Sequence, residues 1–391
     1  MKTAASVMFA LIRSEICETA LDDTIKTGLT DEVLEELFVL SNEHDVAHIV
    51  ASALSKGGLL GDDEASTAFK NVLMAAVYRD AQREYAIKQL AAILGSAGIF
   101  HILLKGSVIL RYYPEAWMRT SCDVDVLVKE KDADSAIKAL CDLGYVRMND
   151  SSAHDYNLFS PNKIHIELHY TLLQDGKLSG ADNILNGVWE NVVLTQGTLC
   201  SYEMPPEVFI IYHLVHMGRH LICGGCGVRP FIDLWLLENK MPYDNKKLFD
   251  MLEESGLVNL YEAASELSKV WMENTAHTEY TKLLEDYILA GGVYGTYGNS
   301  AKVKAAKGES KIKSFLNLMF LPKANLEVLY PNLKKYPYFF PMYQVKRWCR
   351  VFNKSKRDKL KNLTEIRNSV SEANAEPAKM MLEHLGLLNR K

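Results

Sequence analysis

The sequence predicts an α+β fold, in which a small mixed sheet forms a core between N- and C-terminal helical regions. Apolar residues recur at helical spacing before residue 95, strand-like and helix-like segments alternate from 99 to 200, and helical spacing returns after Pro205. A chain of 391 residues is long enough for two or three domains with their own cores. The expected divisions are an N-terminal helical region (1–98), a sheet-containing core (99–200), a helical domain that completes a cleft (201–298) and a basic helical C-terminal region (299–391).

The N-terminal region carries its most regular helical pattern in residues 69–94, which Gly95 and Gly98 follow. A short apolar run at residues 4–12 is interrupted by Arg13 and predicts an amphipathic helix rather than a targeting segment. No stretch of the sequence approaches the length that a membrane span requires. These apolar faces indicate packing and carry no chemistry of their own.

The core is predicted to alternate between strands and helices. In chain order these are a strand ending at Leu104, a helix at 108–113, a strand at 122–128, a helix at 132–143 and strands at 145–148, 156–159 and 164–170. The helix at 132–143 begins with acidic residues and stops before Gly144, as many helices do. After Pro205 the pattern is helical, and a glycine-rich loop at 291–298 marks a boundary before the C-terminal region.

The most informative feature is the pair Asp123 and Asp125 in the strand at 122–128. Side chains of a strand alternate between its two faces, so both carboxylates are expected on one face while the intervening valines occupy the other. Glu167 lies in another strand-like run, and a neighbouring antiparallel strand could bring it beside the pair. Three carboxylates in one place suit Mg²⁺ or Mn²⁺. The alternative interpretation is that the two aspartates belong to a solvated strand edge.

The segment before this strand predicts a phosphate-binding turn. Lys105, Gly106 and Ser107 follow a short apolar strand and precede a helix. A tight glycine turn at the start of a helix presents backbone N–H groups, and here also a hydroxyl, to a phosphate. Phosphoryl transfer chemistry needs a metal site such as the carboxylates would form, and a phosphate-binding turn before it adds to the case.

Several short motifs together resemble the uncharacterised nucleotidyltransferase family of the polymerase-beta-like superfamily. They are Leu-Lys-Gly-Ser at 104–107, Tyr-Pro at 113–114, Arg119 through Val128, Leu-Gly-Tyr at 143–145 and Ile-Glu-Leu-His at 166–169. The resemblance covers roughly residues 30 to 290. The chain departs from the better-studied minimal nucleotidyltransferases in the fifteen residues between Ser107 and Asp123, a gap that is shorter in those enzymes.

The resemblance implies transfer of a nucleoside monophosphate from a nucleoside triphosphate, with ATP as the first candidate, to an unknown acceptor hydroxyl or phosphate. It implies that Gly106 and Ser107 bind the triphosphate and that the acidic trio holds the metal ions. Lys105 and Arg119 would neutralise phosphate charge. The catalytic and metal-binding residues are then expected to be Asp123, Asp125 and Glu167.

A second group of polar residues lies after Pro205. Its members are His213, His216, His220, Cys223, Cys226, Arg229 and Asp233. The three histidines fall on one face of a helix, and Cys223 and Cys226 have the spacing of zinc ligands, so a structural Zn²⁺ site is one interpretation. The other is that these histidines, together with His169 and Asp233, line the cleft, where Arg229 clamps a phosphate.

Two other functions stay open. The Asp123-Val-Asp125-Val segment also resembles the nucleophile motif of haloacid-dehalogenase-type phosphatases, although the residues before it, 118–122, are more polar than that motif requires. Alternatively, the chain could bind a nucleotide or a partner protein without turnover, as an antitoxin-like module would.

Charge is unevenly distributed along the chain. Residues 302–361 contain sixteen Lys and Arg against three acids, a net charge of +13 in a chain whose net charge is −5. This segment could bind an anionic partner such as RNA, a nucleotide-linked acceptor or a membrane surface. The alternative is a solvated set of helices whose aromatic residues pack beside prolines. Seven cysteines without a regular spacing favour a reducing, cytoplasmic location.

Overall fold

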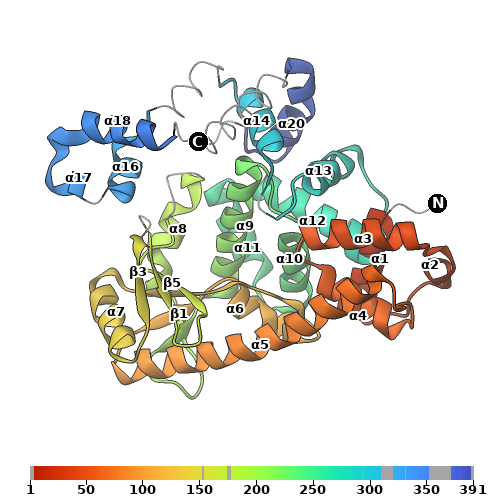
Figure 1. Cartoon of the computed structure of the whole chain (residues 1–391), viewed down its shortest axis with the longest axis horizontal. Helices are drawn as coiled ribbons and strands as arrows, with labels where there is room; N and C mark the ends of the chain where they lie inside the picture. Colours follow the sequence, from red (N-terminus) through yellow and green to blue (C-terminus); the bar gives the residue numbers. More distant parts are fainter. Residues whose placement is uncertain are drawn as a thin grey trace.

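The computed structural model describes residues 4–151, 154–173, 178–293, 295–309, 320–330, 332–351 and 371–388. One mixed sheet is surrounded by helices, which confirms the α+β fold with its small sheet core (Figure 1). The strands are β1 (His101–Leu103), β2 (Asp123–Val128), β3 (Val146–Ser151), β4 (Asp155–Phe159), β5 (His165–His169), β6 (Val193–Leu194) and β7 (Ser201–Glu203).

Helices precede, interrupt and follow the sheet in the chain. Before and within the sheet these are α1 (Ala4–Ile16), α2 (Asp23–Gly28), α3 (Asp31–Glu43), α4 (Ala47–Lys56), α5 (Glu64–Ser96), α6 (Gly106–Ile109), α7 (Ala133–Asp142) and α8 (Asp182–Asn186). After the sheet they are α9 (Pro206–Cys223), α10 (Arg229–Lys240), α11 (Asn245–Ser255), α12 (Val258–Glu273), α13 (Glu279–Leu289), α14 (Tyr297–Ala306), α16 (Lys323–Leu329), α17 (Asn332–Lys335), α18 (Phe340–Val351) and α20 (Glu372–His384).

The strand order in the sheet is β3-β4-β5-β2-β1-β7-β6. The pairs β2–β5 and β1–β7 are parallel and the other neighbours are antiparallel. The expectation that an antiparallel strand delivers Glu167 beside β2 is therefore wrong. Helix α7 carries the chain back before the β3–β4 hairpin, so β5 runs in the same direction as β2.

The two edge strands β6 and β7 were not expected from the sequence. They contain two and three residues, too few to show the alternation of polar and apolar side chains that identifies a strand. β7 extends the sheet because its backbone pairs with β1, with His101 opposite Ser201. This pairing leads the chain directly into α9, which begins at Pro206, a residue suited to the first turn of a helix.

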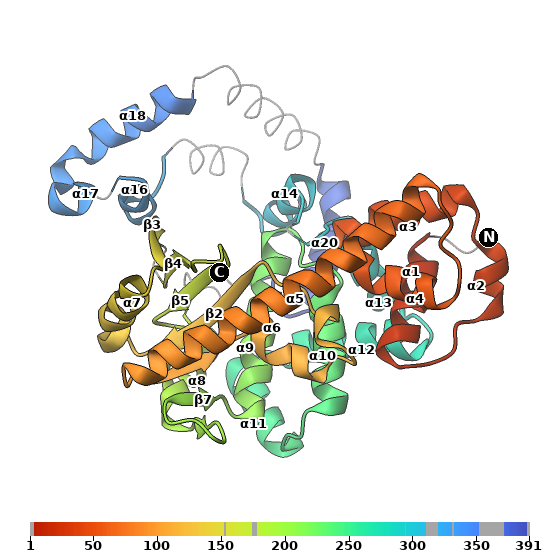
Figure 2. The ribbon, with the colours of Figure 1, turned by 60° about the horizontal axis from the view of Figure 1, so that its bottom comes forward.

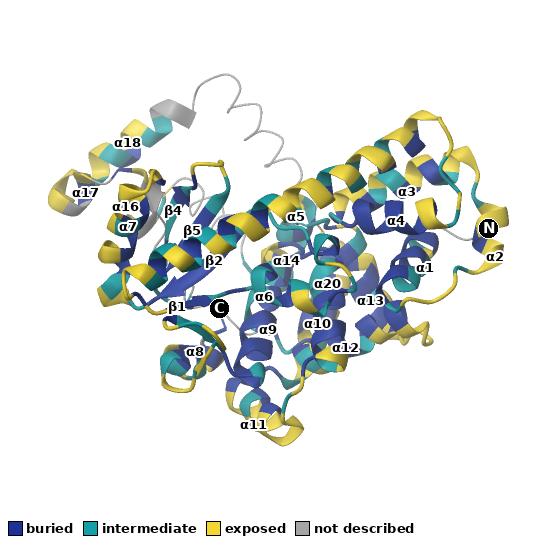
Figure 3. Cartoon of the chain, turned by 90° about the horizontal axis from the view of Figure 1, so that it is seen from below, coloured by how far each residue is buried: buried dark blue, intermediate teal, exposed yellow. Residues whose placement is uncertain are grey.

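Helix α5 crosses beside both the sheet and the N-terminal helices (Figure 2). It has 33 residues, begins after Asp63, whose carboxylate accepts a hydrogen bond from Ser66 N, and ends at Ser96, between the two glycines expected to follow it. Near its end, Leu90 and Leu94 pack with valines of β2 and with α7. Figure 3 shows exposed residues along the side of α5 that faces away from β2.

The larger hydrophobic core joins regions that are far apart in the sequence. The expected amphipathic helix at the N-terminus is α1, and the ring of its Phe9 stacks on Trp271 of α12 with a centroid distance of 4.4 Å. Met118, before β2, and residues of α9 and α10 belong to the same core. The N-terminal helices and the helices after the sheet thus share one core, and the four expected divisions stay a prediction.

The basic segment 302–361 is only partly within the described residues, because 310–319, 331 and 352–361 fall outside them. In the described part, Leu326, Tyr330 and Leu333 form a small core of their own, against which Tyr343 packs. Tyr338 is 69% exposed, so not every aromatic residue of this segment is used in packing. Within the part of the chain that the structure describes, no helix combines the length and the apolar character needed to cross a membrane.

Candidate functional site

Asp123, Asp125 and Glu167 are brought together by the parallel pairing of β2 with β5. The register places Asp125 opposite Glu167 and Asp123 opposite His165. Val124 and Val126 of β2 are buried on the other face, against α5 and α7, so the predicted separation of valines and carboxylates is present. Carboxylate oxygens and imidazole nitrogens lie within 4.8 Å of one another in two overlapping sets, Asp123 with His165 and Glu167, and Asp125 with Glu167 and His169.

Lys105 reaches this group from the end of β1. Its Nζ lies 2.7 Å from Asp125 Oδ1 and 3.8 Å from Glu167 Oε2. The backbone of Lys105 has φ 44° and ψ −124°, and the Ser107 N–H donates to Leu104 O across a tight turn at 3.1 Å. Glycine favours these angles at the first central position of a type II′ turn, so a lysine here is strained. We call Asp123, Asp125, Glu167, Lys105 and His169 the carboxylate cluster.

His169 completes the buried side of the carboxylate cluster. Its Nε2 lies 2.8 Å from Asp125 Oδ1 and 3.4 Å from Glu167 Oε2. Burial lowers the pKa of His169, but the hydrogen bonds to Asp125 and Glu167 outweigh it and raise that pKa to about 8. Burial raises the pKa of Asp125, yet the charge of Lys105 and the hydrogen bond from His169 hold it well below its usual range.

The pKa of Glu167 shifts the other way. The hydrogen bond from His169 lowers it, but burial and the charge of Asp125 together outweigh that bond, and the net shift is upward. Asp123 lies at the outer end of the cluster, where Ser121 Oγ donates to its Oδ1 at 2.6 Å. His165 is oriented by Asn157, whose Oδ1 lies 2.8 Å from His165 Nε2. Each acid of the cluster therefore has a different electrostatic environment.

The cluster opens into a cavity of about 560 Å³ between the sheet and α9, a size typical of small-molecule sites. The residues predicted for the site that line it are Lys105, Gly106, Arg119, Asp123, Asp125, Glu167, His213, His216, His220, Arg229 and Asp233, and Cys223 and Cys226 of the second polar group line it too. His169 lies behind the carboxylates, outside the lining. Ser107 is not among the lining residues either, and its N–H is already used in the turn. The structure thus brings Gly106, but not Ser107, to the cavity.

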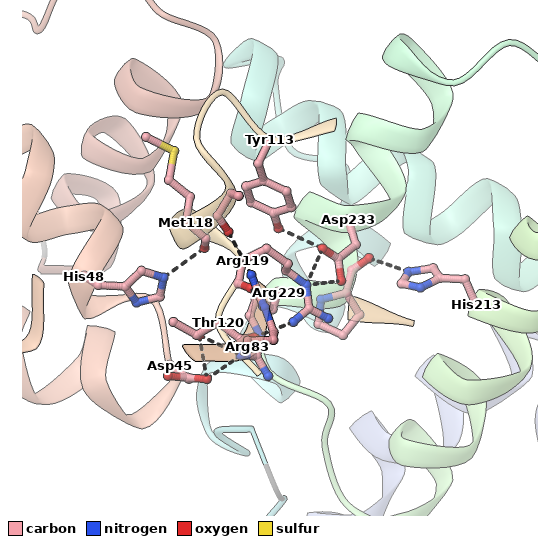
Figure 4. Close-up of polar contacts among 12 residues, drawn as sticks. Asp45, His48, Arg83, Tyr113, Met118, Arg119, Thr120, His213, Arg229 and Asp233 are labelled. Carbon is pink, nitrogen blue, oxygen red and sulfur yellow. Dashed lines mark hydrogen bonds and ion pairs between the residues drawn. The ribbon is translucent and has the colours of Figure 1, made fainter. Parts of the chain in front are cut away.

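Two arginines predicted to bind phosphate are held in ion pairs on another wall of the cavity (Figure 4). Arg119 Nε donates to both carboxylate oxygens of Asp233, at 2.9 and 3.0 Å, and Tyr113 Oη donates to the same carboxylate at 2.8 Å. Arg229 Nη1 contacts Asp45 and donates to Thr120 O at 3.0 Å. We call Arg119, Asp233, Tyr113, Arg229 and Asp45, with Thr120 between them, the arginine network.

The histidines of α9 face the cavity without forming a three-ligand metal site in the part of the chain that the structure describes. His213 Nε2 donates to Pro230 O at 2.8 Å, and His216 Nε2 lies 3.1 Å from His220 Nε2. Burial lowers the pKa of His220 to about 4 and raises the pKa of Cys226 above its usual range. Cys223 and Cys226 are not part of a disulfide, and neither belongs to a group of potential metal ligands among the described residues.

Tyr212 and Asp45 are among the residues of the cavity wall that sequence reasoning missed. Tyr212 is 4% exposed, and its hydroxyl has no hydrogen-bond partner in the structure. A helical signal for it exists, since Tyr212 lies four and eight positions before His216 and His220 on α9. Asp45 carries no such signal, because it belongs to the turn between α3 and α4 and approaches Thr120 only through the tertiary fold.

The donor atoms of the carboxylate cluster fit a hard divalent cation. Three carboxylates converge on one edge of the cavity, and the Lys105 ammonium, hydrogen-bonded to Asp125 and 3.8 Å from Glu167, shows that the arrangement already accommodates positive charge. Carboxylate oxygens are the ligands that Mg²⁺ and Mn²⁺ prefer, and imidazole is compatible with Mn²⁺. The residues of the carboxylate cluster therefore fit Mg²⁺ or Mn²⁺.

Comparison with known proteins gives a family for this chain. The sequence pattern of the family described as "uncharacterised nucleotidyltransferase" matches residues 31–273. The chain belongs to this family. The matched segment runs from the first residues of α3 to the end of α12, so it contains the whole sheet, the carboxylate cluster and the arginine network, and it stops before the basic segment. A search of the curated proteins found no match.

Proposed function

We propose that the protein is a metal-dependent nucleotidyltransferase that moves a nucleoside monophosphate from a nucleoside triphosphate, with ATP as the first candidate, to an acceptor hydroxyl or phosphate. The observation that carries this proposal is the convergence of Asp123, Asp125 and Glu167 at the edge of a cavity of suitable size. Family membership supports the same reaction class. We expect the reaction to take place in the cytoplasm, with the basic segment available to an anionic acceptor.

In this reaction the carboxylates would hold the metal, and residues of the cavity walls would bind the triphosphate. Mg²⁺ or Mn²⁺ held by Asp123, Asp125 and Glu167 would neutralise the triphosphate and activate the acceptor oxygen. The acceptor oxygen forms a bond to the α-phosphorus while the bond from that phosphorus to its bridging oxygen breaks, and pyrophosphate leaves in line. Gly106 lets the triphosphate approach the backbone closely, since it has no side chain, and Lys105 and Arg229 supply positive charge.

A nucleotide-binding module without turnover is the second candidate, and one observation favours it. Lys105, Arg119 and Arg229 each contact a carboxylate in the structure, so these cations would have to leave their partners before they could stabilise the phosphate that is transferred. Such a module would bind a nucleoside triphosphate and leave it intact. The two candidates differ in the fate of the α-phosphate, which can be measured directly.

The first test follows labelled nucleotide in a cell extract to which the protein has been added. The proposal expects label from α-labelled ATP, or from another nucleoside triphosphate, to move to an acceptor, and label from γ-labelled nucleotide to leave as pyrophosphate. Transfer of the γ-label would indicate a kinase. Nucleotide binding without transfer of either label would favour the non-catalytic module.

The second test uses Asp125→Asn, with Asp142→Asn on the exposed surface of α7 as its matched control. We expect ATP with Mg²⁺ or Mn²⁺ to raise the melting temperature of the wild type and of the control, because a ligand that binds only the folded state stabilises it. The Asp125→Asn protein should remain folded and lose this metal-dependent increase. An equal increase with and without metal in all three proteins would contradict the proposed site.

A further inference from the structure

The carboxylate cluster already contains a cation, the ammonium group of Lys105. The Lys105 side chain is 19% exposed and that of Asp125 only 4%, so their contact of 2.7 Å is largely shielded from water. Glu167 Oε2 lies 3.8 Å from the same nitrogen. A divalent ion that binds Asp125 and Glu167 would place its charge beside the Lys105 ammonium, which contacts the same two carboxylates. Because like charges repel, metal binding and the Lys105 contact compete.

The same contact also limits what Lys105 can do for a phosphate. While Nζ is bonded to Asp125, its charge is largely neutralised by that carboxylate and is weakly felt by an anion in the cavity. Lys105 reaches the cluster from the end of β1, and its backbone there is strained. Strain of this kind is commonly stored where a residue must change partners during function.

Tyr212 marks a place in the cavity where a bound phosphate could become the second partner of Lys105. Its hydroxyl is buried, lines the same cavity and lacks a hydrogen-bond partner in the structure. Tyr212 and Lys105 are close enough for each to influence the ionisation of the other. A phosphate oxygen in this part of the cavity would satisfy the tyrosine hydroxyl and give Lys105 an anion to replace Asp125.

We propose that Lys105 exchanges partners, bonding the carboxylates when the site is empty and the phosphate chain of the nucleotide when metal is bound, so that metal and triphosphate bind cooperatively. This inference rests on the proposed function and adds to it a coupling between the two ligands. Metal frees Lys105 for the phosphates, and the phosphates hold Lys105 away from the metal ligands. By thermodynamic linkage, each ligand then raises the affinity for the other by the same factor.

The experiment measures Mn²⁺ and inorganic tripolyphosphate binding by calorimetry, each alone and both together. Tripolyphosphate carries the phosphate chain without a base, so the choice of nucleotide does not affect the result. The test variants are Lys105→Met and Lys105→Gly, the second of which favours the turn conformation found at this position. Tyr212→Phe removes the neighbouring hydroxyl alone, and Lys138→Met on the exposed face of α7 is an inert control. Melting curves establish that each protein is folded.

We expect both Lys105 variants to bind Mn²⁺ alone more tightly than the wild type, by about tenfold, the factor that one charge-assisted hydrogen bond represents. The same variants should bind tripolyphosphate with Mn²⁺ more weakly, and the cooperativity between the two ligands should fall. Tyr212→Phe should weaken only the tripolyphosphate. An affinity for Mn²⁺ that is unchanged or reduced in both Lys105 variants overturns the exchange, as does an increase of equal size in Tyr212→Phe. A wild type that binds no Mn²⁺ at all instead overturns the proposed metal-dependent function.

Discussion

The carboxylate cluster and the arginine network lie on the same cavity, and both contain buried ion pairs, but they differ in how firmly each charge is held. Asp233 is 1% exposed and accepts hydrogen bonds from Arg119 and Tyr113, neither of which has a positive φ; in the arginine network that feature belongs to Asp45, at its exposed end. In the carboxylate cluster, Lys105 contacts Asp125 and Glu167 at unequal distances from a strained turn. The arginine network therefore has the properties of a fixed structural support. The carboxylate cluster has the properties of a site in which Lys105 can change its partner.

The arginine network also connects more of the chain than the cluster does. Asp45 precedes α4, Arg119 and Thr120 precede β2, and Arg229 and Asp233 belong to α10 (Figure 4). Arg83 of α5 contacts Arg119 O and donates to Ala116 O at 3.2 Å, so a further helix is tied to the same loop. The segment that leads into β2 is therefore fixed from several sides. This fixes the position of Asp123 and Asp125 in β2, although neither residue is part of the arginine network.

Among variants that distinguish the two regions, Asp233→Asn is expected to lower the free energy of unfolding the most. This change keeps the shape of the side chain and leaves the buried guanidinium of Arg119 without a counterion, which costs about 3–5 kcal/mol in comparable buried pairs. The matched variant Asp125→Asn should cost clearly less, because Lys105 also contacts Glu167 and borders the cavity. The free energy of unfolding from urea titrations of both variants measures the difference. Equal costs would mean that the carboxylate cluster is as much a structural support as the arginine network.

A smaller effect on the free energy of unfolding is expected from the titration of His48, which lies beside the arginine network. His48 Nε2 donates to Met118 O at 2.8 Å, and burial lowers the pKa of His48 to about 4. In the unfolded chain the pKa returns to about 6.5, so between these values the unfolded state binds more protons than the folded state. The contribution of His48 to stability is therefore complete above about pH 6.5 and is lost as the pH falls toward the folded value.

The variant His48→Gln tests this dependence, because glutamine can still donate to Met118 O and does not titrate. Wild type should lose up to about 3 kcal/mol more than the variant between neutral pH and pH 4, measured as the free energy of unfolding in urea at each pH. Parallel curves for the two proteins would show that the pKa of His48 is the same in the folded and unfolded states.

Local patterns predicted those parts of the site that depend on a single strand or helix. The alternation of valine and aspartate in β2 was sufficient to place Asp123 and Asp125 on one face, and both line the cavity. Helical spacing on α9 was sufficient to direct His216 and His220 to one wall. Family membership and the α+β fold follow from the order of such segments, and both are confirmed.

The remaining features depend on contacts that no local pattern encodes. The direction of β5 beside β2 is decided by the crossover through α7, and β6 and β7 are too short to show a period. Lys105 was expected to neutralise phosphate, but in the folded chain Asp125, twenty positions away in sequence, is the nearer anion. Arg229 meets Asp45 across 184 positions, a pairing that only the tertiary fold creates.

The smallest effect is expected for Asp45→Ala, which tests whether the exposed end of the arginine network takes part in binding. The Asp45 side chain is 42% exposed, and Arg229 keeps its bonds to Thr120 O and Oγ1, so loss of the carboxylate charge should cost less than about 1 kcal/mol of stability. Asp45→Ala adds the cost of placing alanine at φ 53°, which asparagine tolerates. If Arg229 clamps a phosphate, removal of the competing carboxylate should tighten tripolyphosphate binding by about two- to fivefold, and 0.5 M salt should reduce this gain through screening. Asp45→Asn is the matched control for shape and should give a similar gain. Calorimetry with tripolyphosphate decides between two roles for Arg229, because an unchanged affinity in both variants would mean that Arg229 supports the loop before β2 and does not contact the ligand.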